Sequence, residues 1–181
     1  MKSEFITLTD YHIEKANTLA KLRKDECIRN NRVSRDNMVD DSPYENLLGA
    51  RTETAAYLYF RTIGIGKVSW NHNNGNYVGE CCADIDTFID VKGVDSSRKS
   101  LLIKPRYEDN WAFLLVNAEA HPTYEIVGWC WGKEGKINHK SIYKTYDKNR
   151  PKAYFIPRNH EIIKPPQLLF NILKEKIECP V

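Results

Sequence analysis

The spacing of apolar residues predicts two helices in the first third of the chain. In residues 7–25, apolar side chains recur every three or four positions, and Thr9 or Asp10 provides a helix cap. Residues 29–43 are polar and end in Asp-Asp-Ser-Pro, which is typical of a loop. A second helix is predicted from Tyr44 to Phe60. The apolar stripes of the two helices are Ile13, Ala16, Leu19, Ala20 and Leu22, and then Tyr44, Leu47, Leu48, Ala55, Leu58 and Tyr59.

From Gly64 onward the pattern changes from helical to extended. Short apolar stretches, rich in β-branched and aromatic residues and bounded by polar residues, Gly or Pro, predict strands. These stretches are Val68–Trp70, Thr87–Val94, Leu101–Ile103, Trp111–Val116, Tyr124–Trp131 and Ala153–Ile156. Residues 132–152 are basic and show no clear period, whereas Gln167–Ile177 has the apolar spacing of a C-terminal helix.

The order of these elements predicts an α/β (α+β) fold in which helices flank a mixed β-sheet. A chain of 181 residues is long enough for one domain with a substantial core. We divide it into an N-terminal helix and loop (1–43), a core with the candidate site (44–157) and a C-terminal helix (158–181). Because the chain has neither a bilayer-spanning apolar run nor an apolar signal core, we expect a cytoplasmic protein without a membrane partner.

Cysteine content and net charge narrow the function only slightly. The five cysteines are odd in number and lack CxxC or Cys/His spacing, so we expect neither a disulfide framework nor a zinc site. A net charge of +3 is mildly basic and does not by itself identify a nucleic-acid partner. Local basic clusters are more informative: Arg98-Lys99, Lys104-Pro-Arg106, and several lysines within residues 133–152.

Residues 83–93 place three carboxylates and one lysine in an otherwise apolar stretch. Asp84 and Asp86 come first, and Asp90 and Lys92 follow on the predicted strand, where they share one face. Charges on a core strand cost free energy unless they are paired or bind something. This pattern is compatible with a metal site or with an ordinary ion pair on an edge strand. The same acid-x-Lys spacing in Glu134-Gly-Lys136 lies among glycines, where we expect surface residues.

A shared metal site requires the chain to turn between Asp84 and Asp90. A continuous strand would separate their α-carbons by roughly 20 Å, since each residue rises about 3.3 Å. Two carboxylates that far apart could not bind one metal ion. We therefore expect a turn or bulge near Asp86–Thr87.

The stretch resembles the PD-(D/E)XK nuclease superfamily, in which an Asp is followed by an acid-x-Lys strand in a mixed sheet. More narrowly, it is similar to small phage-encoded nuclease-like proteins of that superfamily, over roughly residues 49–157. The segments that carry the resemblance are Asp84-Ile-Asp86, Asp90-Val-Lys92, Ile103-Lys-Pro105, Phe113-Leu-Leu-Val116, Gly128-Trp129 and Tyr154-Phe-Ile-Pro157.

The resemblance implies a role for each candidate site residue. Asp84 and Asp90 would bind Mg²⁺ or Mn²⁺, and Lys92 would position or activate the attacking water. Glu53, on the preceding helix, would complete the metal site. Hard carboxylate oxygens suit Mg²⁺, which polarises a phosphate and lowers the pKa of its bound water. Two alternatives stay open: Asp86 could replace Asp84 as ligand, and Glu53 could be a solvated helix acid.

The implied function is a Mg²⁺-dependent nuclease with a restriction-endonuclease-like fold. DNA is the expected substrate, with RNA left open, and phage DNA processing, recombination or host-DNA degradation in the host cytoplasm are the implied roles. Lys99, Lys104 and Arg106 would contact phosphates, while the basic residues of 133–152 would clamp the backbone. A nuclease-like fold that binds nucleic acid without cleaving it is the alternative, and a partner-binding protein with a coincidental motif is a third. A homodimer is also left open.

Overall fold

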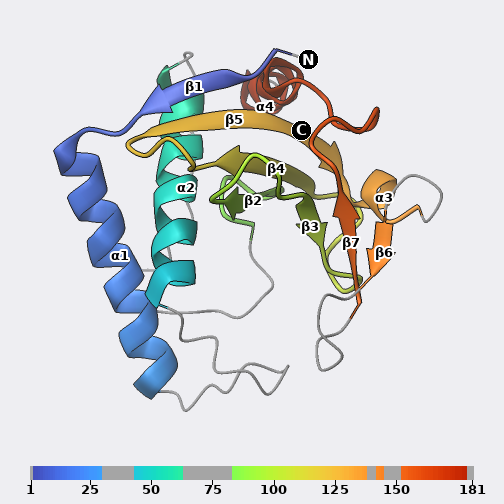
Figure 1. The fold of residues 1–181 in the computed structure, drawn as a ribbon. Coiled ribbons are helices and arrows are strands. Elements are labelled where there is room, and N and C mark those ends of the chain that lie inside the picture. Colours follow the sequence, from blue (N-terminus) through green and yellow to red (C-terminus); the bar gives the residue numbers. More distant parts are fainter. Residues whose placement is uncertain (1, 30–42, 63–82, 138–141, 145–151, 179–181) are drawn as a thin grey trace.

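The computed structural model describes residues 2–29, 43–62, 83–137, 142–144 and 152–178 (Figure 1). Within these residues, the larger sheet has four strands in the order β1-β5-β4-β2. The strands β1, β5 and β4 are antiparallel neighbours, whereas β2 runs parallel to β4, so the sheet is mixed. Their bounds are β1 Glu4–Thr7, β2 Ile89–Val94, β4 Ala112–Asn117 and β5 Thr123–Trp131.

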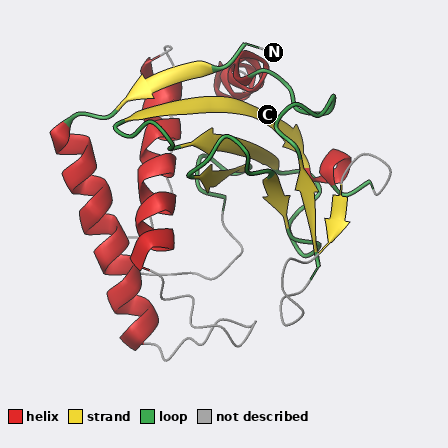
Figure 2. Ribbon diagram, in the orientation of Figure 1, coloured by secondary structure: helices red, strands yellow, loops and turns green. Residues whose placement is uncertain are grey.

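A second sheet of three antiparallel strands lies beside the first, in the order β3-β7-β6. Its strands are β3 Leu101–Ile103, β6 Ile142–Lys144 and β7 Ala153–Ile156. The single-turn helix α3 (Gly132–Gly135) directly follows β5. Figure 2 shows the second sheet at one end of the larger sheet, on the side away from the long N-terminal helices.

Three long helices accompany the sheets: α1 Asp10–Arg29, α2 Pro43–Thr62 and α4 Pro166–Glu178. The helix α2 packs on the larger sheet, where it contacts β2, and α1 packs on the outside of α2. The helix α4 contacts β5. The predicted mixed sheet with flanking helices is therefore confirmed. No described helix combines the length and apolar character needed to cross a membrane.

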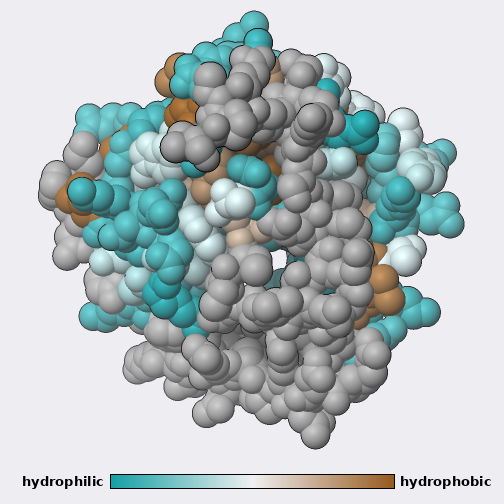
Figure 3. Space-filling view, turned by 180° about the vertical axis from the view of Figure 1, so that it is seen from behind, coloured by the Kyte–Doolittle hydropathy of each residue, from teal (hydrophilic) through white to brown (hydrophobic). Residues whose placement is uncertain are grey.

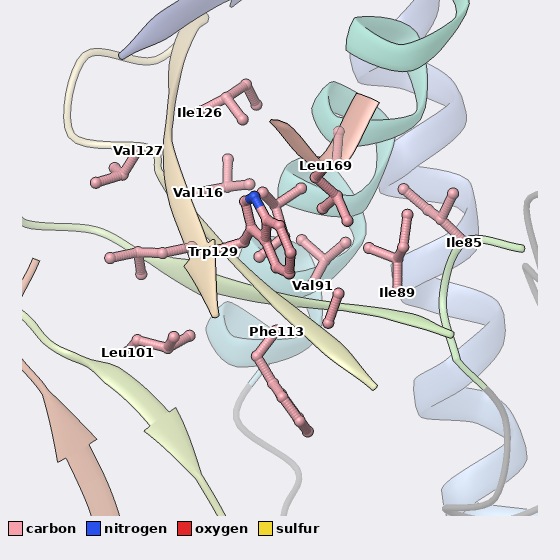
Figure 4. Close-up of a cluster of buried hydrophobic side chains, with 14 of the residues drawn as sticks. Ile85, Ile89, Val91, Leu101, Phe113, Val116, Ile126, Val127, Trp129 and Leu169 are labelled. Atoms are coloured by element: carbon pink, nitrogen blue, oxygen red, sulfur yellow. The ribbon is translucent and has the colours of Figure 1, made fainter. Parts of the chain in front are cut away.

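The main core lies where the larger sheet meets α2 and α4. All six residues of β4 are buried, as expected for a central strand that is covered on both faces. Figure 4 shows Ile85, Ile89 and Val91 directed into this core with Trp129 of β5 and Leu169 of α4. The odd-numbered side chains of β2 thus face the core. The large apolar side chains that stay exposed are Phe5, Tyr11, Leu22, Tyr44 and Leu168, and the back of the molecule shows only scattered apolar surface over the described residues (Figure 3).

Several predicted boundaries need correction. The first helix begins at Asp10, and the residues before it form β1, a strand too short to show a pattern and defined by its pairing with β5. The strand β6 was missed for the same reason, since its partner β7 defines it. Leu22 and Tyr44 belong to the predicted apolar stripes but are exposed. Val68–Trp70 lies outside the described residues.

Gly93 allows α2 to approach β2 closely. A Cβ atom at Gly93 would lie only 2.4 Å from Thr52 Oγ1 and 2.9 Å from Thr52 Cγ2. The Thr52 hydroxyl donates to the carbonyl oxygens of Leu48 and Gly49 within α2, so its position is fixed by the helix. The absence of a side chain at Gly93 therefore sets the distance between this helix and the strand that carries Asp90 and Lys92.

We expect Gly93→Ala to lower the free energy of unfolding by about 1–3 kcal/mol, because the added methyl group overpacks the contact with Thr52. Urea denaturation measures this change. Gly49→Ala, on α2, is the matched control, since its Cβ would lie 3.8 Å from the nearest atom. That variant should be unchanged or more stable by up to about 1 kcal/mol, as alanine favours a helix. Wild-type stability of Gly93→Ala would contradict the prediction.

Candidate active site

The chain reverses direction immediately before β2, at the position that a shared site requires. Ile85 and Ile89 exchange two backbone hydrogen bonds of 3.0 and 3.1 Å, which close a tight turn. Asp86 lies in this turn with a φ of 52°, a left-handed conformation that Asp tolerates better than most residues. The expected turn near Asp86–Thr87 is confirmed, and it brings Asp84 back alongside the strand.

Asp84 lies at the edge of β2 that no other described strand occupies. The carbonyl oxygens of Phe88 and Val94 accept hydrogen bonds from the β4 side, so the backbone groups of the even-numbered residues face β4. The backbone N–H and carbonyl groups of the odd-numbered residues point to the opposite edge, away from β4. There the Val91 N–H donates to Asp84 Oδ2 at 2.7 Å. The carboxylate thus replaces the next strand of the sheet and is held beside Asp90.

Asp90 and Lys92 project from the face of β2 that is turned away from α2. Lys92 Nζ lies 2.5 Å from Asp90 Oδ2, and both side chains are largely buried. The Lys92 ammonium also lies 4.4 Å from the ring centre of Tyr107, which stacks on Phe113 of β4. Asp90 Oδ2 has no hydrogen bond of good geometry from the described residues. Lys92 therefore neutralises this carboxylate without saturating its oxygen.

Glu53 approaches the same edge from α2. Its residue exposure is 6%, so it is not the solvated helix acid of the alternative interpretation. Arg23 of α1 donates to both carboxylate oxygens, at 2.8 Å to Oε1 and 2.6 Å to Oε2. Sequence reasoning missed Arg23, because it lies 30 residues before Glu53 and outside the segment that resembles a nuclease.

The pKa of Asp84 shows that the three carboxylates interact. Burial raises it well above its ordinary value, and the charges of Glu53 and then Asp90 raise it further, against smaller opposing effects of Lys92 and the Val91 N–H. Burial alone would lower the pKa of Lys92, but Asp90, Tyr107 and Asp84 together raise it above the ordinary value. Lys92 is therefore an ammonium at neutral pH. Among the described residues, the acids Glu53, Asp84 and Asp90 thus lie near two cations, Arg23 and Lys92.

This donor set suits a hard divalent cation only in part. Asp84 and Asp90 offer carboxylate oxygens near a surplus negative charge, as Mg²⁺ prefers. Both oxygens of Glu53 are engaged by Arg23. Accordingly, no group of three or more Asp, Glu, His or Cys side chains in the described part of the chain is arranged to hold a metal ion. Asp84 and Asp90 thus have the oxygen chemistry that Mg²⁺ prefers, whereas Glu53 is held by Arg23 in this arrangement.

The predicted phosphate contacts lie in two different places. Lys104 and Arg106 come just before Tyr107, whose ring touches Lys92, so this segment lies beside the candidate site. Lys99 lies beyond the other end of β2, where it forms an ion pair with Asp95. Of the basic stretch 133–152, only residues 133–137, 142–144 and 152 are described.

The second acid-x-Lys pair is not the surface pair that its sequence context predicts. Both residues are half-buried. Glu134 accepts hydrogen bonds from the Trp131 N–H and from the Lys164 ammonium. Lys136 donates to the Tyr107 carbonyl oxygen and to Asp109 Oδ1. The helical turn α3 orders the glycine-containing segment, and each charge of this pair has an opposite charge of its own.

The chain matches no protein-family model, and comparison with curated proteins and with solved structures gives no significant match. The resemblance to PD-(D/E)XK nucleases consequently stays a prediction, and the case for a function depends on the geometry of these side chains.

Asp84→Asn should stabilise the metal-free protein at neutral pH. The raised pKa means that the folded protein binds a proton at Asp84 more tightly than the unfolded chain does. The ionised carboxylate therefore destabilises the fold, and this penalty disappears as the pH falls through the raised pKa towards the ordinary value of 3.8. In EDTA at pH 7, we therefore expect Asp84→Asn to raise the free energy of unfolding relative to wild type.

Urea denaturation between pH 7 and pH 4 measures this effect, and the advantage of the variant over wild type should shrink towards pH 4. Asp86→Asn is the matched control. Asn also tolerates the left-handed conformation, so its stability should stay within about 0.5 kcal/mol of wild type. A loss of stability in Asp84→Asn at pH 7 would show that the carboxylate charge is compensated in the folded protein.

Proposed function

We propose that the protein is a Mg²⁺-dependent nuclease that hydrolyses phosphodiester bonds of DNA, with RNA open as a second substrate. The observation that carries the proposal is the convergence of Asp84, Asp90, Glu53 and Lys92 around the free edge of β2. Glu53 reaches this edge from α2, which packs on one face of the strand. Asp90 and Lys92 project from the opposite face, and Asp84 lies at the edge itself. They match the residues that the resemblance singles out, one by one.

The charge of the cluster supports a functional role. Among the described residues, three carboxylates meet two cations, which is unfavourable because a buried charge without a partner costs several kcal/mol. Clusters that perturb a pKa by burial together with specific neighbouring charges are enriched at functional sites. A divalent cation between Asp84 and Asp90 would offset the surplus negative charge, which makes a metal the natural complement of this site.

Each side chain then has a distinct task. Asp84 and Asp90 would hold the metal, which when bound polarises the phosphate and lowers the pKa of a coordinated water. Lys92 keeps its proton and presents a positive charge where negative charge develops on the phosphate during hydrolysis. The ring of Tyr107 orients the ammonium by a cation–π contact. Lys104 and Arg106 come just before that tyrosine in the chain and would bind neighbouring phosphates.

One observation favours a second candidate, a protein that binds nucleic acid without cleaving it. Arg23 engages both oxygens of Glu53, and Lys92 contacts Asp90 directly, so the cluster is partly neutralised by its own side chains. Both candidates predict salt-sensitive DNA binding, because lysines and arginines displace counterions from the phosphates. Only the nuclease requires a divalent cation.

Circular single- and double-stranded DNA provides the test. With Mg²⁺ or Mn²⁺, wild-type protein should cut the circles, and EDTA should abolish cutting. Asp90→Asn and Lys92→Met should each reduce the rate by about 100-fold or more, since the first removes the charge of a proposed metal ligand and the second removes the positive charge that acts on the transition state. Lys15→Met is the matched control, because it removes an ammonium that lies 4.8 Å from the ring centre of Tyr11, on the separate helix α1.

The result would go against the nuclease if wild type and Asp90→Asn cut equally, or if neither cut with any cation. Salt-sensitive binding of both proteins to DNA without cleavage would favour the second candidate. Circular dichroism of each variant shows whether the fold has survived the substitution.

A further inference from the structure

Arg23 is a member of the charge cluster that comes from a separate helix. Its guanidinium forms a bidentate, two-pronged salt bridge with the Glu53 carboxylate. Only 17% of the Arg23 side chain and 8% of the Glu53 side chain are exposed. Paired hydrogen bonds of this kind are the strongest and most directional contacts between charged side chains. Arg23 thus fixes the orientation of Glu53 and engages both of its oxygens.

The packing of α1 on α2 places Arg23 in contact with Glu53. Ala16, Leu19 and Ala20 are buried on α1 and pack against Ala50 of α2. Arg23 follows at the next position of this stripe, three residues after Ala20, and Glu53 follows Ala50 by three. The small side chains let the two helices approach closely. The same helix contact that buries these alanines therefore places the guanidinium against the carboxylate.

A carboxylate held in this way is a poor metal ligand. The oxygens that a cation would use already accept hydrogen bonds, and the guanidinium charge repels a dication at short range. In the described part of the chain, Asp84 and Asp90 have no such guanidinium partner: Asp84 accepts from the Val91 N–H, and Asp90 contacts Lys92. The structure thus distinguishes Glu53, whose two oxygens are both engaged by Arg23, from Asp90, which contacts Lys92 through Oδ2, and Asp84, which accepts a backbone hydrogen bond.

We infer that Arg23 is a positioning residue that keeps Glu53 from coordinating the metal, so that Asp84 and Asp90, but not Glu53, bind a divalent cation. The inference rests on the proposed function, because it concerns the metal of that site. It adds that α1, which lies outside the region of resemblance, sets the number of protein ligands and keeps the affinity for the cation low.

Binding of Mn²⁺ without nucleic acid provides the test, measured by titration calorimetry and by the electron paramagnetic resonance signal of free Mn²⁺. We expect Arg23→Gln to bind Mn²⁺ at least about tenfold more tightly than wild type, because it frees Glu53 and removes a nearby positive charge. The double variant Arg23→Gln with Glu53→Gln should lose most of this gain. Arg23→Lys, which keeps the charge but not the two-pronged contact, should lie between.

Arg51→Gln is the matched control, because Arg51 also links α2 to α1 but donates to the side-chain oxygen of Asn17 and not to a carboxylate. Its Mn²⁺ affinity should equal that of wild type. A purely structural role of Arg23 would lower thermal stability in Arg23→Gln without tightening Mn²⁺ binding. The neutral double variant avoids an unpaired charge at position 53 and remains informative if Arg23→Gln does not fold.

The outcomes separate the inference from the proposed function. Equal Mn²⁺ affinity in wild type and Arg23→Gln would overturn the role of Arg23 and leave the nuclease proposal standing. Binding by Arg23→Gln but not by wild type would support the role of Arg23 and count against a metal-dependent wild-type enzyme. An absence of binding in both proteins would overturn both.

Discussion

The arrangement of the site depends on how the free edge of β2 is satisfied. Among the described residues, this strand pairs with β4 on one side, so the backbone groups of its odd-numbered residues face away from the described sheet. Unpaired backbone donors in a protein interior are costly, and edges of sheets are commonly covered by other parts of the chain. Here a tight turn returns the chain, and Asp84 accepts the hydrogen bond of Val91. A backbone requirement therefore brings a carboxylate next to Asp90.

Charge balance distinguishes this edge from other ion pairs among the described residues. Glu125 is paired with Arg158, and Glu134 with Lys164, so each of these acids has its own cation. At the β2 edge, the cations of the described residues that meet Glu53, Asp84 and Asp90 are Arg23 and Lys92. One-to-one pairs serve to hold segments together. A surplus carboxylate in an enclosed place raises the free energy of the folded state, which is typical of a site shaped by a ligand.

Three layers of the fold supply the cluster, and each contributes one constraint. The helices α1 and α2 supply Arg23 and Glu53, which are paired with each other. Gly93 lets α2 come close enough to β2 for Glu53 to reach the edge. The strand β2 supplies Asp90 and Lys92. The segment after β3 brings Tyr107 under the ammonium, and Lys136 in turn holds the Tyr107 carbonyl oxygen. Lys92 is thus restrained from two sides, by a carboxylate and by an aromatic ring.

The amino-acid sequence by itself determined the type of most elements and the pairing of Asp90 with Lys92 on one strand face, because periodicity is a local property. The need for a turn at Asp86–Thr87 also followed from chain geometry alone. The short strands β1 and β6, the burial of Glu53, and the contacts of Arg23 and Tyr107 were decided by tertiary structure. These features join residues far apart in the chain, and their free energy comes from partners that no local pattern specifies.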